Sequence, residues 1–188
     1  MLVFTRWLRT DESLVGAARD GDIPRVERLL QSGANVNVTD APNCSRTSLH
    51  YACERGDVKM IQLLLSRNAN VNATTSNGST PLHEAAYAGH IMAANLLIEA
   101  KAMVNAETST NHVTPLHDAA YNGHTALAAF LLRRGANINA LTTSNRTPLH
   151  NASTTHSIHS NHQSNPIRSS INQLNPWGAI RCSCRRTC

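Results

Sequence analysis

One short motif recurs along the chain at nearly constant spacing, and this recurrence limits the possible fold more than any other feature. The motif reads Thr-Pro-Leu-His, with Ser replacing Pro in the first copy. Its copies begin at Thr47, Thr80, Thr114 and Thr147, which are 33, 34 and 33 residues apart. A period in this range predicts a solenoid, in which each unit buries its apolar face against its neighbours.

The residues of the motif predict how each unit begins. Thr80 is a good N-cap, and Pro81 fits the first helical position because no amide hydrogen is missed there. Leu82 then opens an apolar stripe that continues at Ala85, and Gly89 favours the left-handed conformation that ends a helix. The motif residues of the four copies are Thr47, Leu49, His50, Thr80, Pro81, Leu82, His83, Thr114, Pro115, Leu116, His117, Thr147, Pro148, Leu149 and His150.

A second element repeats in step with the first. It lies at residues 33–37, 68–72, 102–105 and 135–139, and each copy contains Val-Asn or Ile-Asn. With both elements in register, the chain from Ser13 to Ala152 resembles the ankyrin-repeat family. The resemblance implies an all-α solenoid of stacked helix-turn-helix units with projecting β-hairpin-like loops. It also implies that partners bind on the concave face.

The repeat boundaries divide the chain into three regions. Residues 1–12 form an N-terminal extension, either a helical turn on the first unit or a frayed end. The ankyrin-repeat domain covers residues 13–152, with about four full repeats at 13–44, 45–77, 78–111 and 112–144 and a truncated fifth at 145–152. Because no second helix follows in the fifth unit, we expect fraying at unit four. Residues 153–188, rich in Ser, Asn and His, read as a disordered tail.

The net charge of +5 is placed unevenly. Residues 1–152 hold 13 Lys and Arg against 12 Asp and Glu, whereas the tail adds four arginines and no acid. The basic tail gives a second hypothesis, a regulatory protein that associates with nucleic acid through the tail and uses the repeats as a docking arm. Steep salt dependence and loss of binding on deleting residues 153–188 are the expected marks of that alternative.

The sequence predicts an intracellular protein, cytoplasmic or nuclear. Its longest apolar runs are shorter than a membrane span requires, and the N-terminal apolar segment is too interrupted for a signal peptide. Five cysteines, an odd number without framework spacing, fit a reducing compartment. We expect a monomer that contacts no membrane.

The sequence lacks catalytic motifs, so we expect no enzyme and no cofactor. There is no phosphate-binding Gly-rich loop, no Gly-x-Ser-x-Gly and no His-Glu-x-x-His. The motif histidines lie in different layers, too far apart to share a metal ion, and we expect each imidazole to bridge neighbouring units. Cys53 stands where other units have alanine, which indicates a buried structural thiol. Cys182, Cys184 and Cys188, with the tail histidines, match no closed zinc pattern.

The expected partner is another protein, bound by a scaffold or adaptor surface. Mapping the repeat register onto the concave side gives eight candidate contact residues: Tyr51, Glu54, Arg55, Glu84, Tyr87, Asp118, Tyr121 and Asn122. Tyr87 and Tyr121 are equivalent positions in adjacent layers and suit interface anchors, although tyrosines there can instead pack between units. The neutral Thr, Ser and Asn residues at the loop tips either bind a partner or satisfy turn geometry.

The family resemblance carries one further implication. Asn72 and Asn105 match the loop position at which ankyrin proteins are substrates of asparaginyl hydroxylation. Asn70 and Met103 stand where an acidic residue is common in such substrates.

Overall fold

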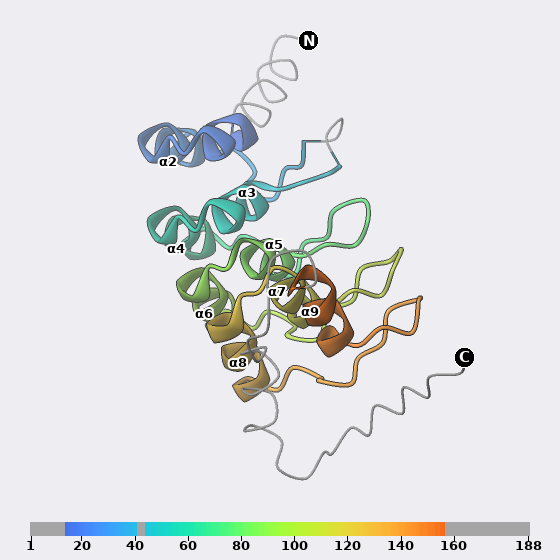
Figure 1. Cartoon of the computed structure of the whole chain (residues 1–188). Helices are drawn as coiled ribbons and strands as arrows, with labels where there is room; N and C mark the ends of the chain where they lie inside the picture. The colour runs from blue at the N-terminus through green and yellow to red at the C-terminus, as the bar shows by residue number, and fades with distance from the viewer. Residues whose placement is uncertain (1–13, 41–43, 157–188) are drawn as a thin grey trace, which may run out of the picture.

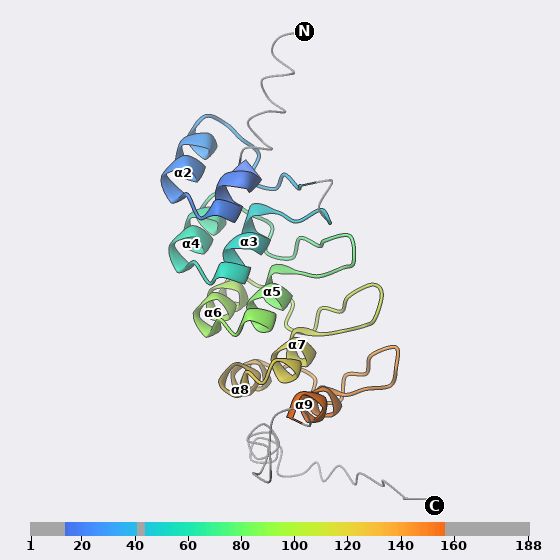
Figure 2. The same ribbon diagram turned by 45° about the horizontal axis from the view of Figure 1, so that its top comes forward.

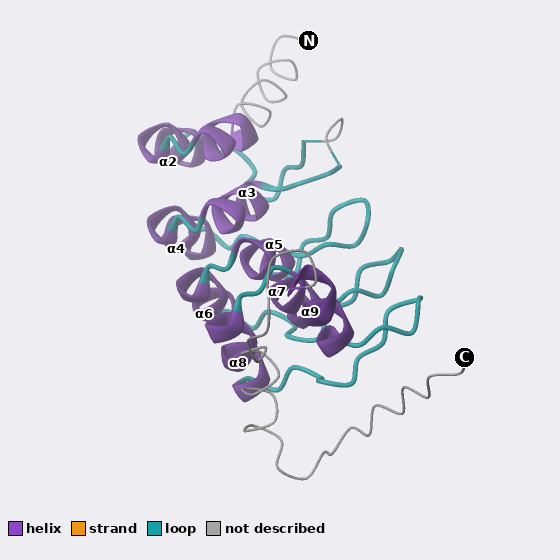
Figure 3. Cartoon of the chain, in the orientation of Figure 1, coloured by secondary structure: helices purple, strands orange, loops and turns teal. Residues whose placement is uncertain are grey.

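The protein is a stack of helix pairs, and the all-α solenoid expected from the repeats is confirmed. The structure, a computed structural model, describes residues 14–40 and 44–156. A helical segment at residues 14–20 is followed by α2 (Ile23–Gln31), α3 (Ser48–Arg55), α4 (Val58–Ser66), α5 (Pro81–Ala88), α6 (Ile91–Glu99), α7 (Pro115–Tyr121), α8 (Thr125–Arg133) and α9 (Pro148–His156). Helices α3, α5, α7 and α9 form an inner row, and α2, α4, α6 and α8 form an outer row (Figures 1 and 3).

Each helix pair starts and turns where the motif predicts. Thr80 has an extended backbone (φ −102°, ψ 165°), which is compatible with the proline that follows and begins α5. Gly89 ends α5 in the left-handed region, with φ 82°. A side chain at Gly89 would also collide with the His124 ring of the next unit, since its Cβ would lie 2.7 Å away. Glycine there allows both the turn and the close approach of the next layer.

Small and large apolar residues alternate through the core. The motif leucines Leu49, Leu82 and Leu116 are at most 1% exposed, and the neighbouring alanines let the inner helices approach closely. The outer row contributes Ile61, Leu64, Ala94, Leu97, Leu127 and Leu131, all buried. One continuous core therefore runs through the layers.

The last described helix belongs to the truncated fifth unit. Helix α9 continues to His156, four residues beyond Ala152, where the sequence analysis places the domain boundary. Phe130 and Leu132 on α8 are half-buried, as are the equivalent residues of α4 and α6, Leu63, Leu65, Leu96 and Ile98. The N-terminal extension and nearly all of the tail lie outside the described residues.

The loops between units form a row of four fingers: residues 38–46, of which 41–43 lie outside the described residues, 73–79, 106–113 and 140–146 (Figure 2). A backbone bond closes each base, for example from Thr75 N–H to the Ser79 carbonyl at 2.9 Å. Backbone bonds also join successive fingers, as from Ser109 N–H to the Asn77 carbonyl at 2.9 Å. Among the described residues the only bridge of β type joins Thr39 and Thr47. The fingers therefore support one another without forming a sheet.

The motif histidines connect each unit to the next. The Thr80 N–H donates to Nδ1 of His83 at 3.1 Å, so Nδ1 is the acceptor and the ring proton lies on Nε2. Nε2 then donates to the Val113 carbonyl of the following unit at 3.0 Å. His50 and His117 make the same pair of contacts, to the carbonyls of Ser79 and Arg146. Each buried imidazole is thus a neutral bridge between layers, as the sequence predicts.

Acid should weaken these bridges. Burial lowers the pKa of His50 and of His83 from 6.5 to about 4, so the unfolded chain takes up these protons first. The stabilisation is complete above about pH 6.5 and is lost as the pH falls toward 4, at about 3 kcal/mol for each histidine. Imidazole Cε1–H resonances followed by NMR should stay in the neutral form until near pH 4. Titration of both rings near 6.5 would contradict the bridge.

The first motif copy lacks its proline, and restoring it should stabilise the protein. Ser48 is fully buried, and its hydroxyl has no hydrogen-bond partner. Thr47 before it is extended (φ −93°, ψ 168°), as a following proline requires. Ser48→Pro should raise the free energy of unfolding in urea by about 1 kcal/mol. The reverse change at the equivalent site, Pro81→Ser, is the matched control and should lower it; a loss in both variants would refute this account.

Candidate functional site

Five of the eight candidate residues lie together on one surface, which we call the inner face. It is the exposed side of α3, α5 and α7 that carries Glu54, Glu84, Tyr87, Asp118 and Tyr121. The direct stacking of α3 on α5 and of α5 on α7 brings these positions into adjacent layers. The last residue of the first finger, Arg46, contacts this face directly.

Tyr51, one of the eight candidates, offers little surface to a partner. Its side chain is only 8% exposed, and its hydroxyl donates to Oδ2 of Asp40 in the first finger. The Arg46 guanidinium covers its ring, with Cζ 4.4 Å from the ring centroid. Sequence reasoning missed Arg46, because no periodic signal marks a residue that lies outside the motif and reaches across two layers.

The Arg46 side chain contacts two residues of α3 and one residue of α5. One of its terminal nitrogens lies 2.9 Å from Oε2 of Glu54 in its own unit and 2.8 Å from Oε2 of Glu84 in the next. With Tyr51 beneath it, the guanidinium has two carboxylates and one aromatic ring around it. The site shows how this face binds a planar cation.

Tyr87 and Tyr121 project from the inner face. They occupy the same position in α5 and α7, and they are 57% and 49% exposed. These exposures do not support the alternative in which both rings pack between units. Two large aromatic side chains therefore stand accessible on a rigid surface, one layer apart.

The carboxylates beside these tyrosines lie in an unfavourable environment. Burial, followed by the charge of Glu84, raises the pKa of Asp118 from 3.8 to about 7. Burial also raises the pKa of Glu84, and Arg46 opposes that rise. No ion pair engages Asp118 within the part of the chain that the structure describes. The inner face therefore holds a half-buried carboxylate without a matching cation.

The two remaining candidates contact the backbone. Arg55 points back to the first unit, where its guanidinium donates to the Arg19 carbonyl at 3.4 Å. Asn122 donates to the Asp118 carbonyl at 3.0 Å. Neither residue is part of the cluster around Tyr87.

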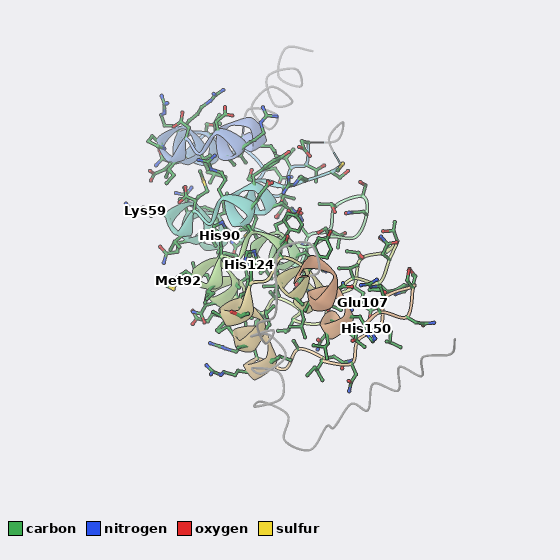
Figure 4. All side chains as sticks on the ribbon, viewed as in Figure 1. Lys59, His90, Met92, Glu107, His124 and His150 are labelled. Carbon is green, nitrogen blue, oxygen red and sulfur yellow. The ribbon has the colours of Figure 1, made fainter. Side chains whose placement is uncertain are left out.

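Two further histidines, His90 and His124, also bridge neighbouring units, and they lie outside the Thr-Pro-Leu-His motif. His90 Nε2 contacts the Glu54 carbonyl at 3.1 Å, and His124 Nε2 contacts the Tyr87 carbonyl at 3.0 Å (Figure 4). The available signal was the Gly-His pair that ends the first helix of units three and four. These contacts fix the ends of α3 and α5 next to the candidate residues.

The finger residues divide between the two roles left open by the sequence. A threonine closes the base of three fingers: for example, Thr75 Oγ1 accepts from the Ser79 N–H at 3.0 Å, and Thr108 Oγ1 accepts from the Val113 N–H at 3.0 Å. In the first finger Asp40 takes this role and accepts from the Arg46 N–H. Residues at the tips, such as Ser109 and Asn145, are exposed. Turn geometry therefore accounts for the threonines, and the tips remain available for contacts.

The described part of the chain offers neither a metal centre nor a membrane-spanning helix. No group of three His, Cys, Asp or Glu side chains is arranged to hold a metal ion there, and no helix there is sufficiently long and apolar to pass through a bilayer. The cysteines and histidines of the tail, and the arginines of the nucleic-acid hypothesis, lie outside the described residues.

Comparisons with known proteins agree with the repeat architecture. Family models described as ankyrin repeats match residues 14–108 and 97–152. The ankyrin-repeat domain is a non-catalytic interaction module. The ankyrin repeat and KH domain-containing protein mask of Drosophila melanogaster is 38% identical over 104 residues, 53% of this chain. The 2-5A-dependent ribonuclease of Mus musculus is 37% identical over 38% of the chain, and mouse ankyrin repeat domain-containing protein 63 is 42% identical over 35%. The matches span only 3%, 10% and 16% of those proteins.

Removing the charge of Asp118 should stabilise the free protein. Because its pKa is higher in the folded state, the ionised carboxylate opposes folding above about pH 7, and this effect fades as the pH falls toward 3.8. Asp118→Asn should raise the free energy of unfolding at pH 8 by about 1–2 kcal/mol, a value reduced for partial exposure. Urea titrations at pH 8 and pH 5 measure the effect, which should be smaller at pH 5.

Asp57→Asn supplies the control for the loss of a carboxylate. Asp57 caps α4 by accepting from the Met60 N–H at 3.1 Å, and asparagine can keep that bond. This variant should show no gain at pH 8. If the free energy of unfolding of Asp118→Asn at pH 8 does not exceed that of the unmodified protein at the same pH, the described environment of Asp118 is contradicted.

Proposed function

The chain belongs to the ankyrin-repeat family, and we propose that it is a non-enzymatic scaffold or adaptor that binds another protein on its inner face. Ankyrin repeats in general bind other proteins. The proposal assigns partner contact to Glu54, Glu84, Tyr87, Asp118 and Tyr121. It applies to the repeat region at residues 13–152 as one interaction domain.

One observation carries the proposal: Tyr87 and Tyr121 are exposed at equivalent positions of two directly stacked helices. Tyrosine gives a large contact area and loses little side-chain entropy on binding, so it is common among residues that dominate binding energy. The bridging histidines hold the helices that carry both rings. A partner therefore meets a surface that needs little reorganisation.

The fingers extend this surface. Their exposed tips carry Ser, Thr and Asn, which favour polar complementarity over long-range charge steering. We propose that the tips contact the same partner as the tyrosines. The cysteine pattern supports an intracellular setting, cytoplasmic or nuclear, for this interaction.

The test is the combined substitution Tyr87→Ala and Tyr121→Ala in the full chain. Immobilised protein is used to capture partners from lysate, and captured proteins are quantified by mass spectrometry. Loss of two central aromatic anchors should reduce specific capture at least about tenfold. Circular dichroism should show unchanged helix content, since both side chains are exposed.

Met92→Ala is the matched control. Met92 is 62% exposed on α6 in the outer row, and Figure 4 shows it on the edge of the stack away from Glu107 of the third finger. This change removes a similar exposed apolar side chain and should leave capture unaltered. Equal capture by the double tyrosine variant and the unmodified protein, or an equal loss with Met92→Ala, would reject the inner face as the binding surface.

A further inference from the structure

The structure contains its own example of how the inner face binds a guanidinium group. Arg46 immediately precedes the Thr47 motif, and three side chains surround its terminal group. Glu54 and Glu84 supply carboxylate oxygens at 2.9 and 2.8 Å, and Tyr51 supplies a ring 4.4 Å away. A cation here therefore meets one tyrosine and two carboxylates.

The next layer repeats this set of side chains without an arginine. In the motif register, Tyr51, Glu54 and Glu84 correspond to Glu84, Tyr87 and Asp118 one unit later. The set again consists of one tyrosine and two carboxylates. The two kinds of residue have changed places, because Glu84 stands at the position of Tyr51 and Tyr87 stands at the position of Glu54. Ser79 stands at the position of Arg46, and its short side chain reaches only Oε1 of Glu84, at 3.4 Å.

The charge balance at this second set is incomplete. Arg46 engages Oε2 of Glu84 from one side, but no cation pairs with Asp118 among the described residues. The pKa of Asp118, raised to about 7 by burial and then by the charge of Glu84, agrees with a carboxylate that lacks its counter-charge. Tyr87 and Tyr121, both exposed, flank it on the two layers.

We propose that Glu84, Tyr87 and Asp118 bind the guanidinium group of an arginine side chain presented by the partner protein. This inference rests on the proposed function and specifies the chemistry of the partner. Arginine fits better than lysine because its planar, forked donors match carboxylates and stack on an aromatic ring, as Arg46 does.

The first test supplies the arginine from within the chain and needs no partner. Ser79→Arg places a guanidinium at the position equivalent to Arg46, so it should pair with Asp118 and raise the midpoint of thermal unfolding by about 2–4 °C. Ser79→Gln, which is long and uncharged, should give no such rise. Adding Asp118→Asn should abolish the increment produced by arginine, measured against Asp118→Asn alone.

The second test uses the full chain and three short peptides: Ac-Gly-Arg-Gly-NH2 and its counterparts with lysine or citrulline. The arginine peptide should shift the backbone amide NMR signals of Glu84, Tyr87 and Asp118, with weak, millimolar affinity. Binding should be about tenfold weaker for Asp118→Asn, which loses a charged hydrogen bond, and should be absent in Ser79→Arg, whose own arginine fills the site. Citrulline, which is neutral, should give no shifts.

Three results would each overturn the proposal. They are a rise in the thermal midpoint for Ser79→Arg that persists with Asp118→Asn, equal shifts from the lysine and arginine peptides, and no shifts at these three residues with the arginine peptide. Failure here is separable from failure of the inner face as a binding surface. Capture that depends on Tyr87 and Tyr121, without guanidinium binding, would retain the docking role and remove only the arginine.

Discussion

The structure depends on one repeated interaction, the neutral imidazole that joins the start of one unit to the finger of the next. Nδ1 of His83 accepts from the Thr80 backbone, which fixes the ring orientation and leaves Nε2 to donate to Val113. The ring is buried, so a lost partner would leave an unsatisfied polar group in the core. Local helix initiation and contact between layers are therefore set by the same side chain.

This coupling explains why one continuous surface can be built from helices of only seven to nine residues. Helices of that length are marginal alone, and here each one packs against at least one neighbouring layer. His124 adds a second restraint at the Tyr87 carbonyl. Side chains on the inner face consequently keep their relative positions, and aromatic and acidic groups of different units act as one site.

The sequence predicted the features that are periodic. The motif located the helix starts and, in the complete units, the glycine turns, the buried leucines and the bridging histidines, because each of these is a local rule that recurs along the chain. It did not predict that Arg46 would cover Tyr51, since that contact depends on a finger residue folding over a helix in three dimensions. The roles of the tyrosines and the limits of the domain remain predictions.

The hydrogen bonds at the finger bases determine where the chain can change in length. Thr75 pairs with Ser79, and Thr108 pairs with Val113 one residue further along, yet both fingers join the stack in the same way. The additional residue lies between the two bonded residues, and His112 next to the base has a positive φ of 52° just as Gly78 has in the shorter finger, at 83°. Insertions and deletions are thus confined to the tips, so a lineage can alter the reach and composition of one finger while the helices and their spacing are inherited unchanged.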